Sequence, residues 1–159
     1  MIIFVSHKNS DSAKAAEVAK TLRDSGHQVY LDLIDDGLKH GNQDLADHLR
    51  SRLAQCNSLI AVISSATQSS WWVPWEIGVA TEKDYPLSSY LTDSTSPPEY
   101  LKKWPVLKSL GDLLQFSTLV KSVENRERTL RQSEYKSAAD SKRIAASEFH
   151  TTLKSKLGQ

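Results

Sequence analysis

The sequence has little of several features that mark common protein classes. It contains one cysteine, Cys56, which excludes an intramolecular disulfide and a cysteine-based metal cluster. No apolar run approaches the ~20 residues of a membrane-spanning helix, and the start, MIIFVSHKNSD, lacks the basic and long apolar segments of a signal peptide. The net charge is only +1, which gives no general attraction to nucleic acid or to anionic membranes. We therefore expect a cytoplasmic protein with no nucleic-acid or membrane partner.

Several nucleotide-binding and catalytic motifs are also missing. The six glycines form neither G-x-G-x-x-G nor G-x-x-x-x-G-K-[ST], which excludes a Rossmann-type dinucleotide site and a P-loop nucleotide site. No G-x-S-x-G occurs, so a serine hydrolase is not indicated. The histidines, at positions 7, 27, 40, 48 and 150, show no metal-ligand spacing, and we predict no metal. A phosphoacceptor receiver domain would need an aspartate where the third strand ends, but Ser64 stands there.

Length and composition indicate one globular body with a tail. The chain has 159 residues, of which 39% are hydrophobic and 25% charged, as in an ordinary soluble domain. From Lys121 onward there are nine Lys or Arg and five Asp or Glu, whereas the first 120 residues carry eleven and fourteen. We therefore predict a domain at residues 1–120 and a basic, helical tail at residues 121–159.

Short apolar runs alternate with helical patterns through the first half of the chain. Strands are expected at 2–6, 27–32 and 58–64, and helices at 10–26, 42–56 and from the tryptophans near residue 71 to about Lys83. This alternation predicts an α/β fold, with a parallel sheet of four to five strands and helices on both faces.

The second half gives weaker signals. YPLSSYL (85–91) suggests a fourth strand, although Ser88 and Ser89 are unusual in a buried one. EYLKKW suggests a helical turn, and PVLKSLGDLLQFSTLVKSV suggests an extended piece followed by a helix. Residues 124–143 are mostly polar, after which apolar residues recur every four positions from Ala145 to Leu157. This last pattern predicts an amphipathic helix that needs a partner surface.

Polar residues follow each predicted strand at the edge where open α/β sheets bind ligands. Ser6, His7, Lys8 and Asn9 follow the first strand, and Asp32 opens an acidic, glycine-containing loop after the second. The segment SSWWVPWEIG (69–78) then places Glu76 near the start of a helix.

Within that segment, helical spacing puts Trp72 and Glu76 on one face. We expect Trp72 to line a pocket around Glu76, and Trp71 and Trp75 to pack against the sheet. The same cluster also fits an ordinary helix start. In that case the aromatic side chains are core residues, and the helix dipole alone stabilises the glutamate near the N-terminus.

Taken together, IIFVSHKNSD, VYLD with its acidic loop, LIAVIS and the spacing from Ser70 through Trp72 to Glu76 resemble a TIR (Toll/interleukin-1 receptor) domain of the stand-alone bacterial kind. The resemblance covers roughly residues 1–83 and implies a flavodoxin-like fold. Many TIR domains cleave NAD⁺ at the nicotinamide–ribose bond, with a catalytic glutamate that corresponds to Glu76. Water then gives ADP-ribose, and attack by the adenine ring gives a cyclic product.

The resemblance also implies roles for the neighbouring residues. Ser6, His7, Lys8, Asn9, Asp32, Ser70 and Trp72 would bind the substrate, with Lys8 suited to the pyrophosphate. NAD⁺ would be the substrate, and no cofactor is needed. The loop from Asp32 to Gly41 would border the cleft and take part in self-association, and a partner protein could act as trigger. Other TIR domains are non-catalytic scaffolds, and the atypical fourth strand and basic tail leave that alternative open.

Overall fold

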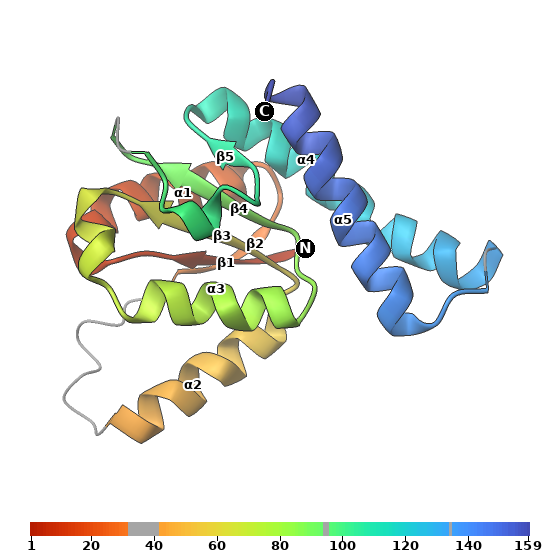
Figure 1. The fold of residues 1–159 in the computed structure, drawn as a ribbon, viewed down its shortest axis with the longest axis horizontal. Coiled ribbons are helices and arrows are strands. Elements are labelled where there is room, and N and C mark those ends of the chain that lie inside the picture. Colours follow the sequence, from red (N-terminus) through yellow and green to blue (C-terminus); the bar gives the residue numbers. More distant parts are fainter. Residues whose placement is uncertain (32–41, 94–95, 134) are drawn as a thin grey trace.

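The computed structural model describes residues 1–31, 42–93, 96–133 and 135–159 (Figure 1). Strands and helices alternate along most of the chain. The strands are β1 Ile2–Ser6, β2 Gln28–Leu31, β3 Ser58–Ile63, β4 Leu87–Leu91 and β5 Val106–Leu107. The helices are α1 Ser12–Asp24, α2 Asn42–Gln55, α3 Trp72–Glu82, α4 Leu110–Ser133 and α5 Ala138–Lys156, with 3-10 turns η1 Asn9–Asp11, η3 Ser65–Ser69 and η4 Glu99–Leu101.

The five strands form one parallel sheet in the order β2-β1-β3-β4-β5. Helices α2 and α3 cover one face of this sheet, and α1, α4 and α5 cover the other (Figure 1). The central strand β3 is buried along its whole length, as expected for a strand covered on both faces. The predicted flavodoxin-like α/β fold is therefore confirmed.

Successive side chains of β1 point to opposite faces of the sheet and so belong to two different clusters of the core. Phe4 packs in the cluster under α2 and α3, whereas Ile3 and Val5 pack in the cluster under α1, α4 and α5. Helix α1 buries the predicted apolar stripe and ends just before Gly26, whose φ of 86° few other residues adopt. This chain reversal leads directly into β2.

The fourth strand is present despite its serines. All five residues of β4 are buried, and the strand pairs in parallel with β3. Ser88 and Ser89 are fully buried on opposite faces of the sheet, next to the large apolar side chains of Leu87, Tyr90 and Leu91. The predicted turn at EYLKKW corresponds to η4, and Trp104 is buried behind it.

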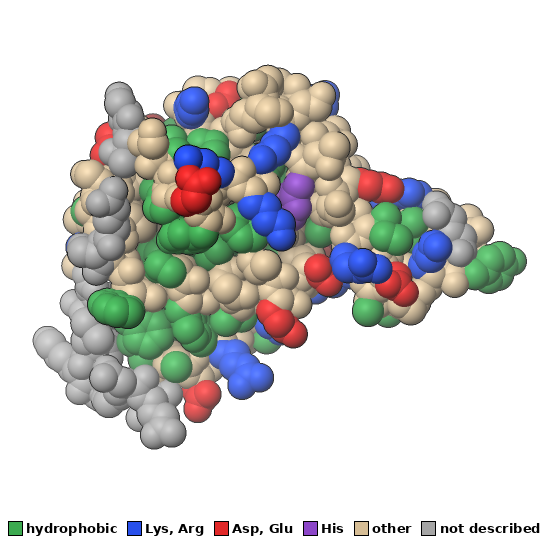
Figure 2. Space-filling model, viewed as in Figure 1, with side chains coloured by type: hydrophobic (Ala, Val, Ile, Leu, Met, Phe, Trp, Pro, Cys, Tyr) green, Lys and Arg blue, Asp and Glu red, His purple; other side chains and the backbone are tan. Residues whose placement is uncertain are grey.

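Helices α4 and α5 form a hairpin that packs on the sheet and then projects beyond it (Figure 1). Val123 and Leu130 of α4 and Phe149 of α5 join the same core cluster as Ile3, so the partner surface of the last helix is this body itself. Figure 2 shows Lys, Arg, Asp and Glu side chains close together on the projecting end. The predicted division at residue 120 falls within α4 and stays a prediction.

Among the described residues, none of the helices combines the length and the apolar character that crossing a membrane requires.

Candidate active site

Glu76 and Ser6 meet beneath α3, at the carboxyl end of β1. The alternation of β1 turns Ser6 to the same face as Phe4, which is the face that α3 covers. The Ser6 hydroxyl donates a hydrogen bond to Oε2 of Glu76. Both residues are 0% exposed. The structure therefore brings together a carboxylate and a hydroxyl that lie seventy residues apart in the sequence.

The start of α3 explains how Glu76 reaches this position. Pro74 is the third residue of the helix, where a missing N–H breaks no intrahelical hydrogen bond. The Ser70 hydroxyl accepts a hydrogen bond from the Val73 N–H at 3.3 Å and so satisfies one of the free donors of the first turn. Glu76 shares the buried side of the helix with Val73 and Ile77. Ser70 therefore supports the helix start that carries Glu76.

The residues after β1 are held by local contacts. His7 is 5% exposed, and its Nε2 lies 3.2 Å from Oγ of Ser12. Lys8 is half-buried, and its Nζ donates to the backbone oxygen of Ala66 at 3.2 Å. Asn9 begins η1 and is exposed. Lys8 thus links the loop after β1 to η3, the turn after β3.

A second polar network at this edge was not predicted from the sequence. Ser64 donates to Oδ2 of Asp11 at 2.8 Å, and Thr67 donates to the same oxygen at 3.5 Å. Ser64 also accepts from the Ala66 N–H, and Thr67 Oγ1 accepts from the Ser64 N–H, which together form a capping box. The spacing of Ser64 and Thr67 is the signal that could have indicated it. Through Asp11, this network fixes the turns after β1 and β3 to one another.

The tryptophans differ from the prediction in one respect. Trp71 was expected to pack against the sheet, but it is 88% exposed, so that prediction is wrong. Its backbone is already helical, and helical spacing puts its side chain opposite the buried side of α3 that Val73 and Ala80 form. Trp72 and Trp75 are half-buried against the core, and their rings meet edge to face at 5.8 Å. The packing role of Trp75 is confirmed, and the role of Trp72 as a substrate contact stays a prediction.

Asp32 and the loop that follows it through Gly41 lie outside the described residues. The predicted contributions of Asp32 to substrate binding, and of the loop to the cleft and to self-association, therefore stay predictions.

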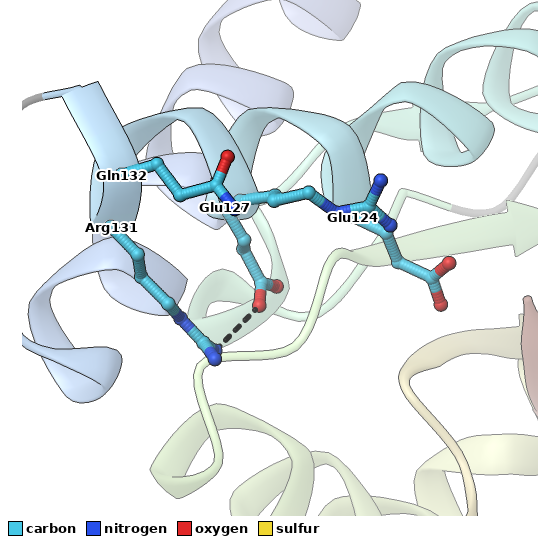
Figure 3. Close-up of a pocket in the computed structure, with 5 residues that line it drawn as sticks. Glu124, Glu127, Arg131 and Gln132 are labelled. Carbon is cyan, nitrogen blue, oxygen red and sulfur yellow. Dashed lines mark hydrogen bonds and ion pairs between the residues drawn. The ribbon is translucent and has the colours of Figure 1, made fainter.

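Two pockets among the described residues lie on the C-terminal hairpin. One, of about 350 Å³, is lined by side chains of α4 that include Glu124, Glu127 and Arg131 (Figure 3). Within it Arg131 and Glu127 form an ion pair at 3.4 Å. Because Glu124 accepts from Asn57, the residue before β3, this pocket lies at the amino end of the sheet, opposite Glu76. The other, of about 330 Å³, lies between α4 and α5.

Metal-binding and cysteine chemistry find no support in the described part of the chain. No group of three or more His, Cys, Asp or Glu side chains there could hold a metal ion. Burial raises the pKa of the Cys56 thiol to about 11, which keeps it protonated and unreactive at neutral pH. Cys56 is a buried residue of the core below α2 and α3.

The arrangement suits stabilisation of positive charge better than nucleophilic attack by serine. The Ser6 hydroxyl donates directly to the Glu76 carboxylate, with no histidine between the two side chains, so the pair lacks the arrangement that activates a serine nucleophile. A carboxylate in a buried setting can stabilise a cationic sugar, because charge interactions are stronger where water is excluded.

Comparison with known proteins identifies the family of the chain. The TIR domain family profile matches residues 3–112, which include all of β1 except Ile2, and the whole of α3 with Glu76. Over 112 residues the chain is 31% identical to the "Probable 3' cyclic ADP-D-ribose synthase ThsB'" of Bacillus cereus (strain MSX-D12). That alignment covers 65% of this chain and 58% of the relative, so the chain spans little more than half of that protein's length. By the extent of the family match, the chain belongs to the TIR domain family.

Proposed function

We propose that this protein cleaves NAD⁺ at the nicotinamide–ribose bond, with Glu76 as the catalytic residue. The observation that carries the proposal is the Glu76 carboxylate, held by Ser6 at the carboxyl edge of the sheet, where α/β folds bind ligands. The family supports it, and so does the relative whose name gives it a cyclic ADP-ribose product.

The chemistry requires one carboxylate. Nicotinamide leaves as a neutral group when the glycosidic bond breaks and takes the bonding electron pair with it, so no general acid has to protonate it. The ribose is left as an oxocarbenium-like cation, which the Glu76 carboxylate stabilises. Addition of water, with loss of a proton, gives ADP-ribose. Addition of a nucleophile from the same dinucleotide gives a cyclic ADP-ribose instead.

The neighbouring residues supply binding rather than chemistry in this proposal. Lys8 is the first lysine or arginine after β1 in the sequence, and its ammonium carries the positive charge that a pyrophosphate attracts. It can therefore bind the pyrophosphate. His7, Asn9 and Asp32 complete the set proposed for substrate binding, and Trp72 forms a wall of the cleft.

Substitution of Glu76 tests the proposal. Purified Glu76→Gln protein, which keeps the side-chain shape, is expected to release nicotinamide from NAD⁺ about 100-fold more slowly than the wild type, or slower still. Glu82→Gln is the matched control, because Glu82 ends the same helix on the exposed surface. Chromatography of nicotinamide and of the ADP-ribose products gives both rate and product. A Glu76→Gln enzyme with the wild-type rate would overturn the catalytic assignment.

A scaffold function without turnover is the second candidate. The complete burial of Glu76 favours it, and so does the exposed Trp71, because exposed tryptophans often anchor protein interfaces. Self-association through TIR–TIR contacts is proposed in both cases. Nicotinamide release and self-association are measured together over a series of protein concentrations in the presence of NAD⁺. Release that rises with self-association supports the enzyme, and self-association without release supports the scaffold.

A further inference from the structure

Three groups that the proposed reaction uses are already bonded within the protein. Ser6 donates to Glu76, His7 lies against Ser12, and Lys8 donates to the backbone of Ala66. Glu76 is 0% exposed, so a substrate atom has no path to its carboxylate in this conformation. A catalytic carboxylate has to touch the ribose. The described conformation is therefore one in which Glu76 is withdrawn.

We propose that Ser6 is a positioning residue that holds the Glu76 carboxylate in this withdrawn position, and that turnover requires their hydrogen bond to break. Ser6 is then not a substrate ligand, because its buried hydroxyl acts on the substrate only through Glu76. The inference rests on the proposed function and adds a control step at the same site.

The physical basis is a balance between two positions of one carboxylate. Hydrogen bonds to an ionised group are among the stronger ones in proteins, and the buried setting strengthens this one. When the carboxylate leaves Ser6, it regains water or meets the substrate. A substrate that contacts only the released carboxylate shifts the balance toward release, and its apparent affinity is lowered by the fraction of molecules that are withdrawn.

The opposite role for Ser6 predicts an opposite result. If Ser6 instead held Glu76 in its working position, loss of the hydroxyl would reduce turnover, because the carboxylate would lose the contact that orients it. If Ser6 holds Glu76 back, loss of the hydroxyl increases turnover. The sign of the effect therefore decides between the two roles.

The sheet offers a matched control. Ser6, Ala61 and Ser89 occupy one row across β1, β3 and β4 and face the same side of the sheet. Ser89 is as fully buried as Ser6, but its hydroxyl has no hydrogen-bond partner among the described residues. Ser89→Ala therefore removes the same buried group from the same row and leaves the contact between Ser6 and Glu76 in place.

The experiment compares four proteins: the wild type, Ser6→Ala, Ser6→Thr and Ser89→Ala. The value of kcat/KM for nicotinamide release from NAD⁺ is expected to rise about tenfold or more in Ser6→Ala, because tenfold corresponds to the lower end of the range for a hydrogen bond to a charged group. Ser6→Thr keeps a hydroxyl and is expected to cancel the rise seen in Ser6→Ala. Ser89→Ala is expected to leave kcat/KM unchanged. Circular dichroism and thermal unfolding show whether each variant is folded. Should Ser6→Ala not fold, Ser6→Cys replaces it, because a thiol fills similar space and donates weakly.

A second measurement does not depend on turnover. Labelling of carboxyl groups with a carbodiimide and an amine, read by mass spectrometry, reports whether Glu76 is accessible to solvent. Labelling of Glu76 is expected to be slow in the wild type and Ser89→Ala and about tenfold faster in Ser6→Ala.

The two measurements separate this inference from the proposed function. If labelling is faster in Ser6→Ala but no variant releases nicotinamide, the result supports the proposal that Ser6 holds Glu76 withdrawn and contradicts the proposed enzymatic function. Turnover that falls in Ser6→Ala, with labelling unchanged, overturns the inference and leaves the enzymatic function standing. An equal effect of Ser89→Ala on both readouts would also overturn it.

Discussion

Trp71 and Trp72 are neighbours in the sequence with different surroundings in the fold. Trp71 is almost entirely exposed, whereas Trp72 packs on the core and on the Trp75 ring. We expect Trp71→Ala to change the free energy of unfolding by less than ~0.5 kcal/mol, as is usual for surface substitutions. Trp72→Ala is expected to cost about 1–3 kcal/mol, because it removes apolar burial and an edge-to-face aromatic pair. Urea denaturation of both variants measures this difference.

The same pair tests the predicted role of Trp72 in substrate binding. If Trp72 lines the cleft, Trp72→Ala raises KM for NAD⁺ at a temperature where the variant is fully folded, and Trp71→Ala does not. A KM that stays at the wild-type value in folded Trp72→Ala would make Trp72 a packing residue only.

At this scale the sequence predicted that Ser6 and Glu76 lie near one another but not how they contact. Strand and helix periods placed Ser6 and Glu76 at one edge of the sheet, and both lie there. Their hydrogen bond depends on the pleat phase of β1 and on the rotation of α3, which spacing along the chain does not determine. Ser6 was therefore assigned to the substrate, whereas its hydroxyl is directed at Glu76.

Among the secondary structure elements, the apolar runs were more predictable than the polar ones. β1 and β3 follow directly from their β-branched residues, and their bounds agree with the sequence to within a residue. Residues 124–143 showed no apolar period, yet α4 continues to Ser133 and α5 begins at Ala138. Ion pairs such as Arg126 with Glu148, at 2.7 Å, and the few apolar contacts at Val123 and Leu130 accompany these polar turns. Tertiary contacts of this kind are not visible in a local pattern.

Helix α5 is held to the sheet through a histidine that has to stay neutral. Nε2 of His150 accepts a hydrogen bond from the Leu87 N–H at 2.9 Å, which a protonated imidazole cannot do. Burial, together with the charges of Lys103 and Lys154, lowers the pKa of His150 from 6.5 to about 4. His27, which contacts Ser117 of α4, has its pKa lowered mainly by burial as well. Both α4 and α5 therefore contact the rest of the fold through histidines that resist protonation.

This arrangement predicts a loss of stability in acid. As pH falls from 6.5 to about 4, the unfolded chain takes up a proton at residue 150 and the folded protein does not, so unfolding is favoured. The contribution of His150 is fully present above pH 6.5 and falls by on the order of 3 kcal/mol across that window. Urea denaturation at a series of pH values measures the slope. His150→Gln, which can still accept from Leu87 but does not titrate, is expected to flatten it.

Two comparisons check that acid-stability prediction. His48→Gln changes an exposed histidine of α2 and is expected to keep the full slope. His150→Gln retains a smaller slope in the same direction, because the pKa of His27 is also lowered. A wild-type slope in His150→Gln would show that the contact with Leu87 does not carry the effect.

In the molecule as a whole, the C-terminal hairpin completes the core on one side of the sheet. Phe116 and Phe149 pack edge to face at 5.5 Å, in the cluster that contains Ile3 and Ile60. The family match ends at residue 112, and the change in charge lies near residue 121, but α4 runs through both positions without a break. Composition predicted a boundary there because the exposed side of the hairpin is polar and basic. It carried no information about the apolar side that faces the sheet.

Truncation tests whether residues 1–120 fold without the tail. Removal of residues 121–159 cuts α4 and takes Phe149 and Leu153 from the core, which leaves the face formed by Ile3 and Ile60 partly open to water. The large core side chains lost are Val123, Leu130, Phe149 and Leu153. At about 1.5–3 kcal/mol of burial each, their loss costs roughly 6–12 kcal/mol, which is comparable to the whole stability of a typical domain, about 5–15 kcal/mol. We therefore expect the fragment to show no cooperative urea transition and to bind a hydrophobic dye, whereas the full chain unfolds in one transition. A fragment that unfolds cooperatively would instead make residue 120 the end of an independent domain and the hairpin an accessory to it.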